Sequence, residues 1–206
     1  MSNIPADNSS RTIDADAALV ASSRQGDLSA FEALVAKYQK RMLNIAFRFL
    51  GDHEDACEVV QDAFVSAYRN LKGFRAEAKF STWLTAITLN LSRNRLKQMK
   101  LLQARVPLSL DAPIQTASGE MMPDPPDREP SVLDRMEKRD VQAKVQDCIK
   151  ALEPDFREVL VLRDMQDLSY EEIGGMLKVA SGTVKSRLFR ARESIKDCLK
   201  KVLGSL

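Results

Sequence analysis

The sequence has little glycine, a single histidine and no long apolar run, and each scarcity excludes a class of protein. Glycine occurs 8 times and histidine once in 206 residues. Without a glycine-rich phosphate loop or a Ser/His/Asp or Cys/His constellation, no enzyme active site can be assembled. No stretch of about 18 apolar residues predicts a membrane span, and the first 16 residues lack the apolar core of a signal peptide. We therefore expect a cytoplasmic protein that is not an enzyme.

Cysteine is also scarce. Cys57, Cys148 and Cys198 form an odd, widely spaced set, which is not a disulfide framework and is typical of a reducing compartment. His53 lies four residues before Cys57 and could share a helix face with it, but two ligands are too few for a structural zinc site. The sequence thus predicts no metal and no cofactor.

The composition predicts an all-α protein of two small domains. The chain is 44% hydrophobic and 29% charged, with abundant Ala, Leu, Glu, Lys, Arg and Gln, which favour helices. Six of the 8 prolines fall in the polar, acidic segment 106–130, which reads as a linker rather than a long surface loop within one domain. We therefore divide the chain into a tail over 1–22, a domain over 23–105, the linker, and a second domain over 131–206.

In the first domain, apolar residues recur every three or four positions from Phe31 to Phe49 and predict a helix that stops at Gly51. Asp52 is a candidate N-cap for a second helix with acidic residues in its first turn. A third helix is expected to begin near residues 81–82. Its predicted apolar side consists of Trp83, Leu84, Ile87 and Leu91.

The second domain ends in a predicted helix-turn-helix. Earlier helices are expected to begin at Ser131 and near Pro154. Ser169 and Glu172 form a capping box for a short helix that carries Ile173 and Leu177 inward. A turn over 179–181 leads to the last helix, expected from residue 182 or 183. Gly174 is expected where the two helices cross, and a glycine there permits a close approach of the backbones. No comparable packing reason explains a glycine at position 175.

Charge is strongly segregated, although the formal net charge is only +2. Residues 52–62 contain five acidic residues and no Lys or Arg, which suggests a basic protein partner. Residues 78–105 contain six basic residues and no acidic one, and residues 183–206 contain seven basic residues against two acidic ones. Two separated basic segments suggest a long polyanion that is contacted twice.

The segment "SGTVKSRLFRAR" over 181–192 combines this positive charge with helical spacing. Val184 and Leu188 are expected to dock on the preceding short helix, which leaves the basic side chains outside. A recognition helix needs this division, because its early residues must reach base edges in the major groove. A solvated basic face is the alternative for an isolated helix, but the capping box, turn and periodicity together favour DNA binding.

Three segments in order carry a resemblance to a known family. They are "GDLSAFEALVAKYQKRMLNIAFRFLGDHEDACEVVQDAFVSAYRNLKGF", "FSTWLTAITLNLSRNRLK" and "LSYEEIGGMLKVASGTVKSRLFRARESIK". From about residue 26 on, the chain resembles the extracytoplasmic-function (ECF) sigma factors of bacterial RNA polymerase. The resemblance implies two helical domains, sigma regions 2 and 4, joined by a linker. It also implies a protein that binds core polymerase, recognises and opens promoters, and directs transcription of stress- or envelope-responsive genes.

The resemblance assigns roles to the first domain. The acidic helix is similar to the surface that docks on the β′ clamp helices, here with Glu54, Asp55, Glu58, Gln61 and Asp62. The loop that captures a flipped base of the −10 element corresponds to Phe74, Arg75 and Lys79. Positions near the opened strand are Phe80, Trp83 and Asn90, and phosphate contacts are Arg93, Arg95 and Lys97. Core packing is the alternative for Phe80 and Trp83.

In the second domain, the resemblance places the last helix on the −35 element, with the β flap of the polymerase as a further partner. Lys185, Ser186, Phe189 and Arg190 are expected nearest the bases, and Thr183 and Arg187 on the DNA backbone. The resemblance also implies that the acidic linker threads toward the polymerase active centre, and that a membrane-bound anti-sigma factor sequesters the protein. The competing hypothesis is a stand-alone helix-turn-helix regulator, which would bind a palindromic site without polymerase.

Overall fold

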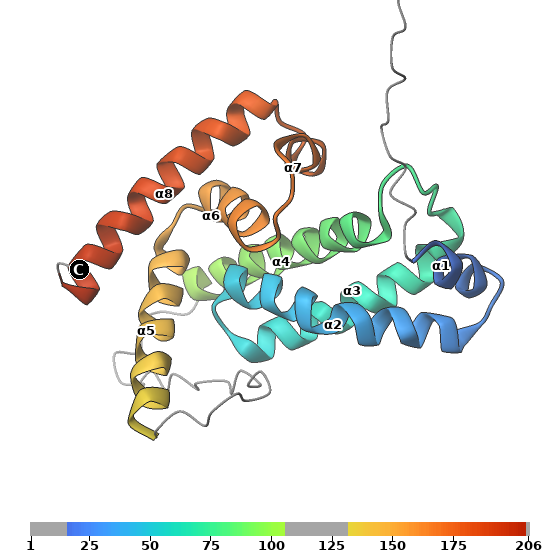
Figure 1. Cartoon of the computed structure of the whole chain (residues 1–206), viewed down its shortest axis with the longest axis horizontal. Coiled ribbons are helices and arrows are strands. Elements are labelled where there is room, and N and C mark those ends of the chain that lie inside the picture. Colours follow the sequence, from blue (N-terminus) through green and yellow to red (C-terminus); the bar gives the residue numbers. More distant parts are fainter. Residues whose placement is uncertain (1–15, 106–131, 205–206) are drawn as a thin grey trace, which may run out of the picture.

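The structure is a computed structural model that describes residues 16–105 and 132–204, and within these ranges every regular element is helical (Figure 1). The prediction of an all-α protein is therefore confirmed. The expected linker, the Ser131 cap and residues 1–15 lie outside the described residues. The N-terminal unit consists of α1 (Ala17–Arg24), α2 (Leu28–Leu50), α3 (His53–Asn70), η1 (Leu71–Gly73) and α4 (Phe80–Arg105). The C-terminal unit consists of α5 (Val132–Ala151), α6 (Pro154–Leu160), η2 (Val161–Met165), α7 (Tyr170–Leu177) and α8 (Ser181–Leu203).

The N-terminal unit is a bundle in which α2, α3 and α4 pack against one another. Local signals set the boundary between α2 and α3 as predicted. Gly51 adopts the left-handed conformation at φ +77° and donates its N–H to the Phe47 carbonyl. Asp52 then accepts the Asp55 N–H at 2.9 Å and caps α3. The change of chain direction between α2 and α3 is thus encoded by Gly51, which tolerates a positive φ, and by Asp52, which accepts a free N–H at the start of α3.

Helix α1 occupies part of the segment that was expected to be a tail. It begins at Ala17, and its Val20 and Ser23 are buried. The preceding Asp16 is also buried, and its carboxylate accepts hydrogen bonds from the Tyr38 hydroxyl and the Lys37 ammonium on α2. Because burial of an unpaired carboxylate would be costly, these two donors account for its position. Residues 16–22, which were expected to belong to the tail, are therefore packed in the bundle.

The buried face of α4 differs from the predicted one. Leu84 is fully buried as expected, but Trp83, Ile87 and Leu91 are only half-buried. Phe80 and Leu89 are also fully buried, and polar residues share this face with them. Thr88 and Ser92 donate their hydroxyls to the carbonyls of the residues four positions earlier, at 3.0 and 2.9 Å. Since these bonds satisfy the hydroxyls inside the helix itself, the side chains can be buried without other polar partners. An apolar periodicity could not reveal them.

In the C-terminal unit, α8 packs against α5, α6 and α7. Pro154 occupies the first turn of α6 as predicted, and one turn of π-helix, η2, follows directly. Val159, Val161 and Leu162 from this segment are buried in the same core as Val184 and Leu188 of α8. This core fixes the long helix on its support.

The prediction about the cysteines was wrong. Cys148 on α5 and Cys198 on α8 form a disulfide, with 5.8 Å between their Cα atoms. The residues are 50 positions apart, and only the packing of α8 on α5 brings them together. Cys57 is free and exposed, and its sulfur lies 3.6 Å from Nδ1 of His53.

Candidate nucleic-acid and polymerase interfaces

The helix-turn-helix forms as the sequence predicts, with a slightly earlier second helix. The Ser169 hydroxyl accepts the Glu172 N–H at 3.2 Å, and the Glu172 carboxylate accepts the Ser169 N–H at 2.8 Å, which completes the capping box. Lys178 ends α7 in the left-handed conformation at φ +56°. Helix α8 begins at Ser181, one or two residues before the predicted start.

Gly174 explains how closely the two helices approach each other. A Cβ atom on this residue would lie 2.8 Å from the carbonyl oxygen of Val179, in the turn. The backbone therefore occupies the space that any side chain would need. At Gly175 no atom lies within 4 Å of such a Cβ, in keeping with the absence of a packing reason for this glycine.

The outer face of α8 carries the predicted DNA-contacting side chains. Val184, Leu188 and Ala191 are buried beneath it. Lys185, Ser186, Phe189 and Arg190 are exposed, and Phe189 keeps 68% of its surface accessible. Phe189 is thus a large apolar side chain that lies exposed between the basic residues Lys185 and Arg190. The ammonium of Lys185 lies 5.5 Å from the ring centroid of Tyr170, so a cation–π contact holds it near the start of α7.

Two predicted backbone contacts on α8 are less accessible. Thr183 is half-buried, and its carbonyl accepts the Ser186 hydroxyl at 3.0 Å. The Arg187 guanidinium is 25% exposed and forms an ion pair with Asp155 on α6 at 2.5 Å. Arg187 therefore already has an anionic partner inside the protein.

The residues predicted for the −10 element lie at the junction between η1 and α4. Three of them form an aromatic cluster: the Phe74 ring lies 4.9 Å from Trp83 and 6.1 Å from Phe80, and Phe80 lies 5.9 Å from Trp83. Phe80 is fully buried and Phe74 is 6% exposed, so the core-packing alternative describes Phe80. The loop above the cluster carries the exposed cations Arg75 and Lys79.

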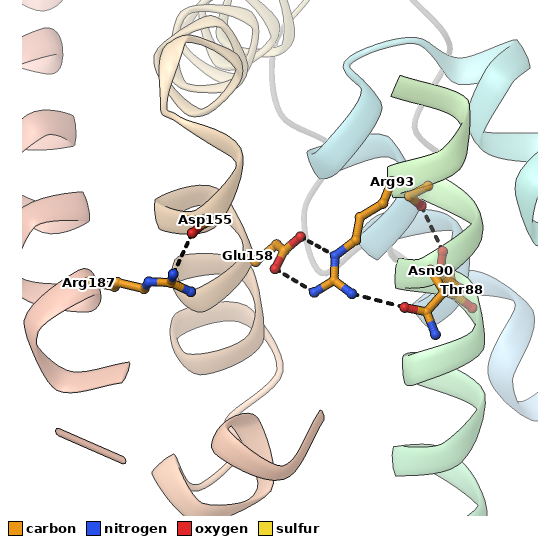
Figure 2. Close-up of polar contacts among 7 residues, drawn as sticks. Thr88, Asn90, Arg93, Asp155, Glu158 and Arg187 are labelled. Atoms are coloured by element: carbon orange, nitrogen blue, oxygen red, sulfur yellow. Dashed lines mark hydrogen bonds and ion pairs between the residues drawn. The ribbon is translucent and has the colours of Figure 1, made fainter. Parts of the chain in front are cut away.

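Further along α4, two of the predicted phosphate contacts are engaged in ion pairs. Arg93 binds both carboxylate oxygens of Glu158 on α6, at 2.5 and 2.6 Å, and also donates to Asn90 (Figure 2). Arg95 donates to Asp55 at 2.7 Å and pairs with Glu58 at 2.9 Å. These carboxylates raise the pKa of both arginines above the ordinary value, so both remain cations. Lys97 is exposed.

The acidic surface on α3 is divided between solvent and the bundle. Glu54, Glu58, Gln61 and Asp62 are exposed. Asp55 and Glu58 turn toward Arg95, and the Asp55 side chain is only 15% exposed. The predicted polymerase surface and one predicted phosphate contact are thus joined by a salt bridge.

Sequence reasoning missed one group of residues entirely. Arg157 and Glu158 on α6 and Gln146 on α5 are buried polar residues that bind the N-terminal unit. No spacing rule indicates them, because their partners lie about 65 to 108 positions away in the sequence. A glutamate and an arginine inside the apolar stretch "DFREVLVL" are the one visible signal, since buried charges are rarely left unpaired.

Other kinds of site are not seen in the part of the chain that the structure describes. No helix over 16–105 or 132–204 is long and apolar enough to cross a membrane. Within the same ranges, no three His, Cys, Asp or Glu side chains gather in a way that could hold a metal ion.

Comparison with known proteins agrees with this geometry. The family model for Sigma-70 region 2 matches residues 34–100, and that for Sigma-70 region 4 matches residues 142–195, which defines a protein of the sigma-70 class. RNA polymerase sigma-H factor of Pseudomonas aeruginosa is 36% identical over 196 residues, which cover 93% of this chain and 97% of that protein. ECF RNA polymerase sigma-E factor of Escherichia coli K12 is 36% identical over 184 residues, with 87% and 92% covered. The chain belongs to the ECF sigma factors.

Solved structures show the same fold. CnrH, in complex with the cytosolic domain of CnrY, superposes with a TM-score of 0.66 over 91% of this chain and 99% of that chain, at 26% identity. The sigma factor RpoE from Bartonella quintana, in complex with the anti-sigma factor NepR, has a TM-score of 0.62 at 20% identity, with 84% and 98% covered. The function that follows is promoter-specific transcription initiation by a DNA-binding initiation factor rather than an enzyme. A stand-alone regulator is not favoured.

Proposed function

We propose that this chain reads promoters at two elements as a subunit of RNA polymerase, with α8 on the −35 element and the η1–α4 region on the −10 element. The observation that carries the proposal is the division of α8. Its apolar side is buried in the C-terminal unit, whereas Lys185, Ser186, Phe189 and Arg190 are exposed. Arg190 can bind guanine through two parallel hydrogen bonds, and Lys185 can contact a base or a phosphate as a point charge.

At the −10 element, the aromatic cluster provides a rigid base for the cationic loop. Phe80 acts from inside the core, where it supports Phe74 and Trp83 instead of contacting the strand. Trp83 retains partial exposure, so its ring is available to stack on an unpaired base. Arg75 and Lys79, together with Asn90, Arg93, Arg95 and Lys97 along α4, then follow the phosphate backbone of the opened strand.

The polymerase surface is proposed to be the exposed acidic part of α3. Glu54, Gln61 and Asp62 face solvent, and their charge suits the basic surface of the β′ clamp helices. Glu58 is already exposed beside them, and Asp55 completes this surface when Arg95 exchanges it for a DNA phosphate. The C-terminal unit is proposed to bind the β flap.

Regulation is proposed to follow that of related sigma factors. One structural relative, CnrH, was solved with the cytosolic domain of CnrY, and another is a sigma factor that was solved with the anti-sigma factor NepR. An anti-sigma factor, anchored in a membrane, would therefore hold this chain inactive in the cytoplasm until a stress of the cell envelope releases it. The acidic linker over 106–130 is proposed to enter the polymerase channel, and replacing its acids with Ser should change the yield of abortive transcripts.

The deciding experiment is transcription of a fragmented genomic library by core RNA polymerase with and without the purified chain, followed by mapping of the start sites. We expect the added starts to share two short motifs separated by about one and a half to two turns of DNA. If the chain fails to bind core polymerase and instead binds a palindrome by itself, the two-element proposal is rejected.

A further inference from the structure

The tyrosine at the start of α7 contacts two cations that come from different elements. Tyr170 is the first residue of α7, which packs on α8 (Figure 1), and its side chain is half-buried. The guanidinium carbon of Arg163, on η2, lies 5.1 Å from the centroid of the Tyr170 ring, and the ammonium nitrogen of Lys185, on α8, lies 5.5 Å from it. Both distances allow a cation–π interaction, whose range extends to about 6 Å. One ring therefore joins η2, α7 and α8 beside the proposed DNA-contacting surface.

The backbone around this ring is fixed by hydrogen bonds. Arg163 donates from Nη1 to the Leu168 carbonyl at 2.9 Å, and the Leu168 N–H donates to the Leu162 carbonyl at 3.2 Å. The next residue, Ser169, uses both its hydroxyl and its N–H in the capping box of α7. Tyr170 thus follows two residues whose backbone groups are engaged, and only two side-chain torsions orient its ring. The ring therefore presents a fixed surface to α8.

Lys185 differs from the cations of α8 that are bound by carboxylates. Arg187 pairs with Asp155, and Arg192 donates to Asp164 at 3.0 and 2.5 Å. Among the residues that the structure describes, Lys185 forms no salt bridge, and the Tyr170 ring is its neighbour instead. A carboxylate would compete with DNA for the ammonium, whereas a ring attracts the ammonium through its quadrupole and leaves the positive charge in place. Tyr170 can therefore orient Lys185 without neutralising it.

Orientation matters for Lys185 because a lysine side chain is long and flexible. Lys185 is exposed on the outer face of α8, and its four-carbon stem gives the ammonium many positions in water. Binding to DNA selects one of these positions, and the lost rotamer freedom lowers the affinity. If the side chain is already held in the free protein, most of this loss is avoided. The expected gain in affinity is about two- to tenfold for one such side chain.

We propose that Tyr170 is a positioning residue for recognition of the −35 element: its ring, which Arg163 supports, keeps the ammonium of Lys185 in the direction in which it meets the DNA. This inference rests on the proposed DNA contact of Lys185. Tyr170 acts through Lys185 and needs no contact with the DNA itself. Removal of the ring should therefore weaken promoter binding only while Lys185 is present.

Nuclear magnetic resonance of the full chain tests the contact between Lys185 and the ring without any DNA. Protons over the face of an aromatic ring resonate upfield of their usual position, so the ε-methylene protons of Lys185 should be shifted upfield. Lys201, exposed at the far end of α8, is the internal reference. We expect Tyr170→Leu to abolish the shift, because leucine is apolar but has no ring, and Tyr170→Phe to retain it. If Lys185 and Lys201 give the same shift in the unmodified chain, the inference is refuted.

A double-mutant cycle tests the consequence for DNA binding. Fluorescence anisotropy measures the affinity of the holoenzyme for a promoter fragment that carries a −35 element, with the unmodified chain, Tyr170→Leu, Lys185→Ala and the double variant. We expect Tyr170→Leu to weaken binding about two- to tenfold and to cause no further loss when Lys185→Ala is already present. Tyr170→Phe is the matched control and should bind like the unmodified chain. Arg163→Gln should cause a loss of the same sign, and it repeats the cycle should Tyr170→Leu fail to fold.

The two measurements separate the possible failures. A loss from Tyr170→Leu that persists in the Lys185→Ala background would refute the positioning role, because it would come from the fold or from a DNA contact of the tyrosine itself. An equal loss from Tyr170→Phe would assign the effect to the hydroxyl group and refute the role of the ring. If Lys185→Ala leaves the affinity unchanged, the proposed DNA contact of Lys185 is wrong and the positioning role falls with it, even where the upfield shift shows that the ring contact exists.

Discussion

Two adjacent glycines in α7 allow a prediction in which one substitution serves as the control for the other. We expect Gly174→Ala to destabilise the helix-turn-helix and Gly175→Ala to stabilise it. A Cβ atom at position 174 would lie 2.8 Å from the Val179 carbonyl oxygen, whereas ordinary contacts begin at 3.4 Å. Because the obstacle is backbone in a tight turn, either α7 or the turn must move. At position 175 the added methyl meets nothing within 4 Å.

The magnitudes follow from two opposing terms. Replacing glycine with alanine inside a helix gains about 1 kcal/mol, and overpacking costs about 1–3 kcal/mol. Gly175→Ala should therefore raise the free energy of unfolding by about 1 kcal/mol, and Gly174→Ala should lower it by up to about 2 kcal/mol. Since the helix-propensity gain is common to both variants, the difference between them measures the cost of the steric contact alone.

Urea unfolding followed by far-UV circular dichroism gives both free energies, and amide hydrogen exchange shows whether the change is confined to α7 and α8. The Gly174→Ala variant should also lose affinity for a −35 element in complex with core polymerase, because any shift of the turn moves the start of α8. If both alanine variants stabilise the chain equally, the close approach of α7 to the turn is not present, and the reasoning fails.

Three further predictions concern other parts of the molecule. Phe80→Ala should lower the free energy of unfolding by about 3–5 kcal/mol, as expected for a fully buried aromatic ring, measured through Trp83 fluorescence; a loss below about 1 kcal/mol would contradict its core position. Lys185→Ala should weaken holoenzyme binding to a −35 element by about 1–3 kcal/mol in footprinting titrations. Lys201 is exposed at the far end of α8, and Lys201→Ala should leave this affinity unchanged. Equal losses of affinity in the two variants would refute a contact between Lys185 and the bases. The Cys148–Cys198 disulfide closes a loop of 50 residues, and its reduction should lower the free energy of unfolding by about 4 kcal/mol in urea titrations. The Cys198→Ser variant is the control. If reductant still destabilises this variant, the loss of stability does not come from the disulfide.

The local features of the fold could be predicted well because each depends on neighbours in the sequence. The stop at Gly51, the cap at Asp52 and the capping box of Ser169 with Glu172 all satisfy helix ends within three or four residues. The buried side of α8 follows from helical spacing alone. The same reasoning failed on α4, where Thr88 and Ser92 are buried, because a hydroxyl bonded to its own helix has no apolar signature.

The sequence could indicate which residues belong to the candidate site, but it could not indicate which of them are already bound to other side chains. Sequence placed Arg93 and Arg187 on two basic surfaces, and the structure shows both on α-helices that face α6. Their partners Glu158 and Asp155 belong to a helix for which the sequence suggested no binding role. An ion pair across 65 residues leaves no periodic trace, since its geometry depends on how two helical units dock.

The sequence by itself determined the long helices after α1, the caps at Asp52 and Ser169, the turn before α8 and the segregation of charge, because these properties follow from side chains within one or two turns of each other. The tertiary structure alone decided that Cys148 meets Cys198, that Phe80 lies in the core, and that Glu158 occupies Arg93. Each of these depends on the packing of distant helices, whose contacts are selected by the shape and burial of whole surfaces and not by spacing along the chain.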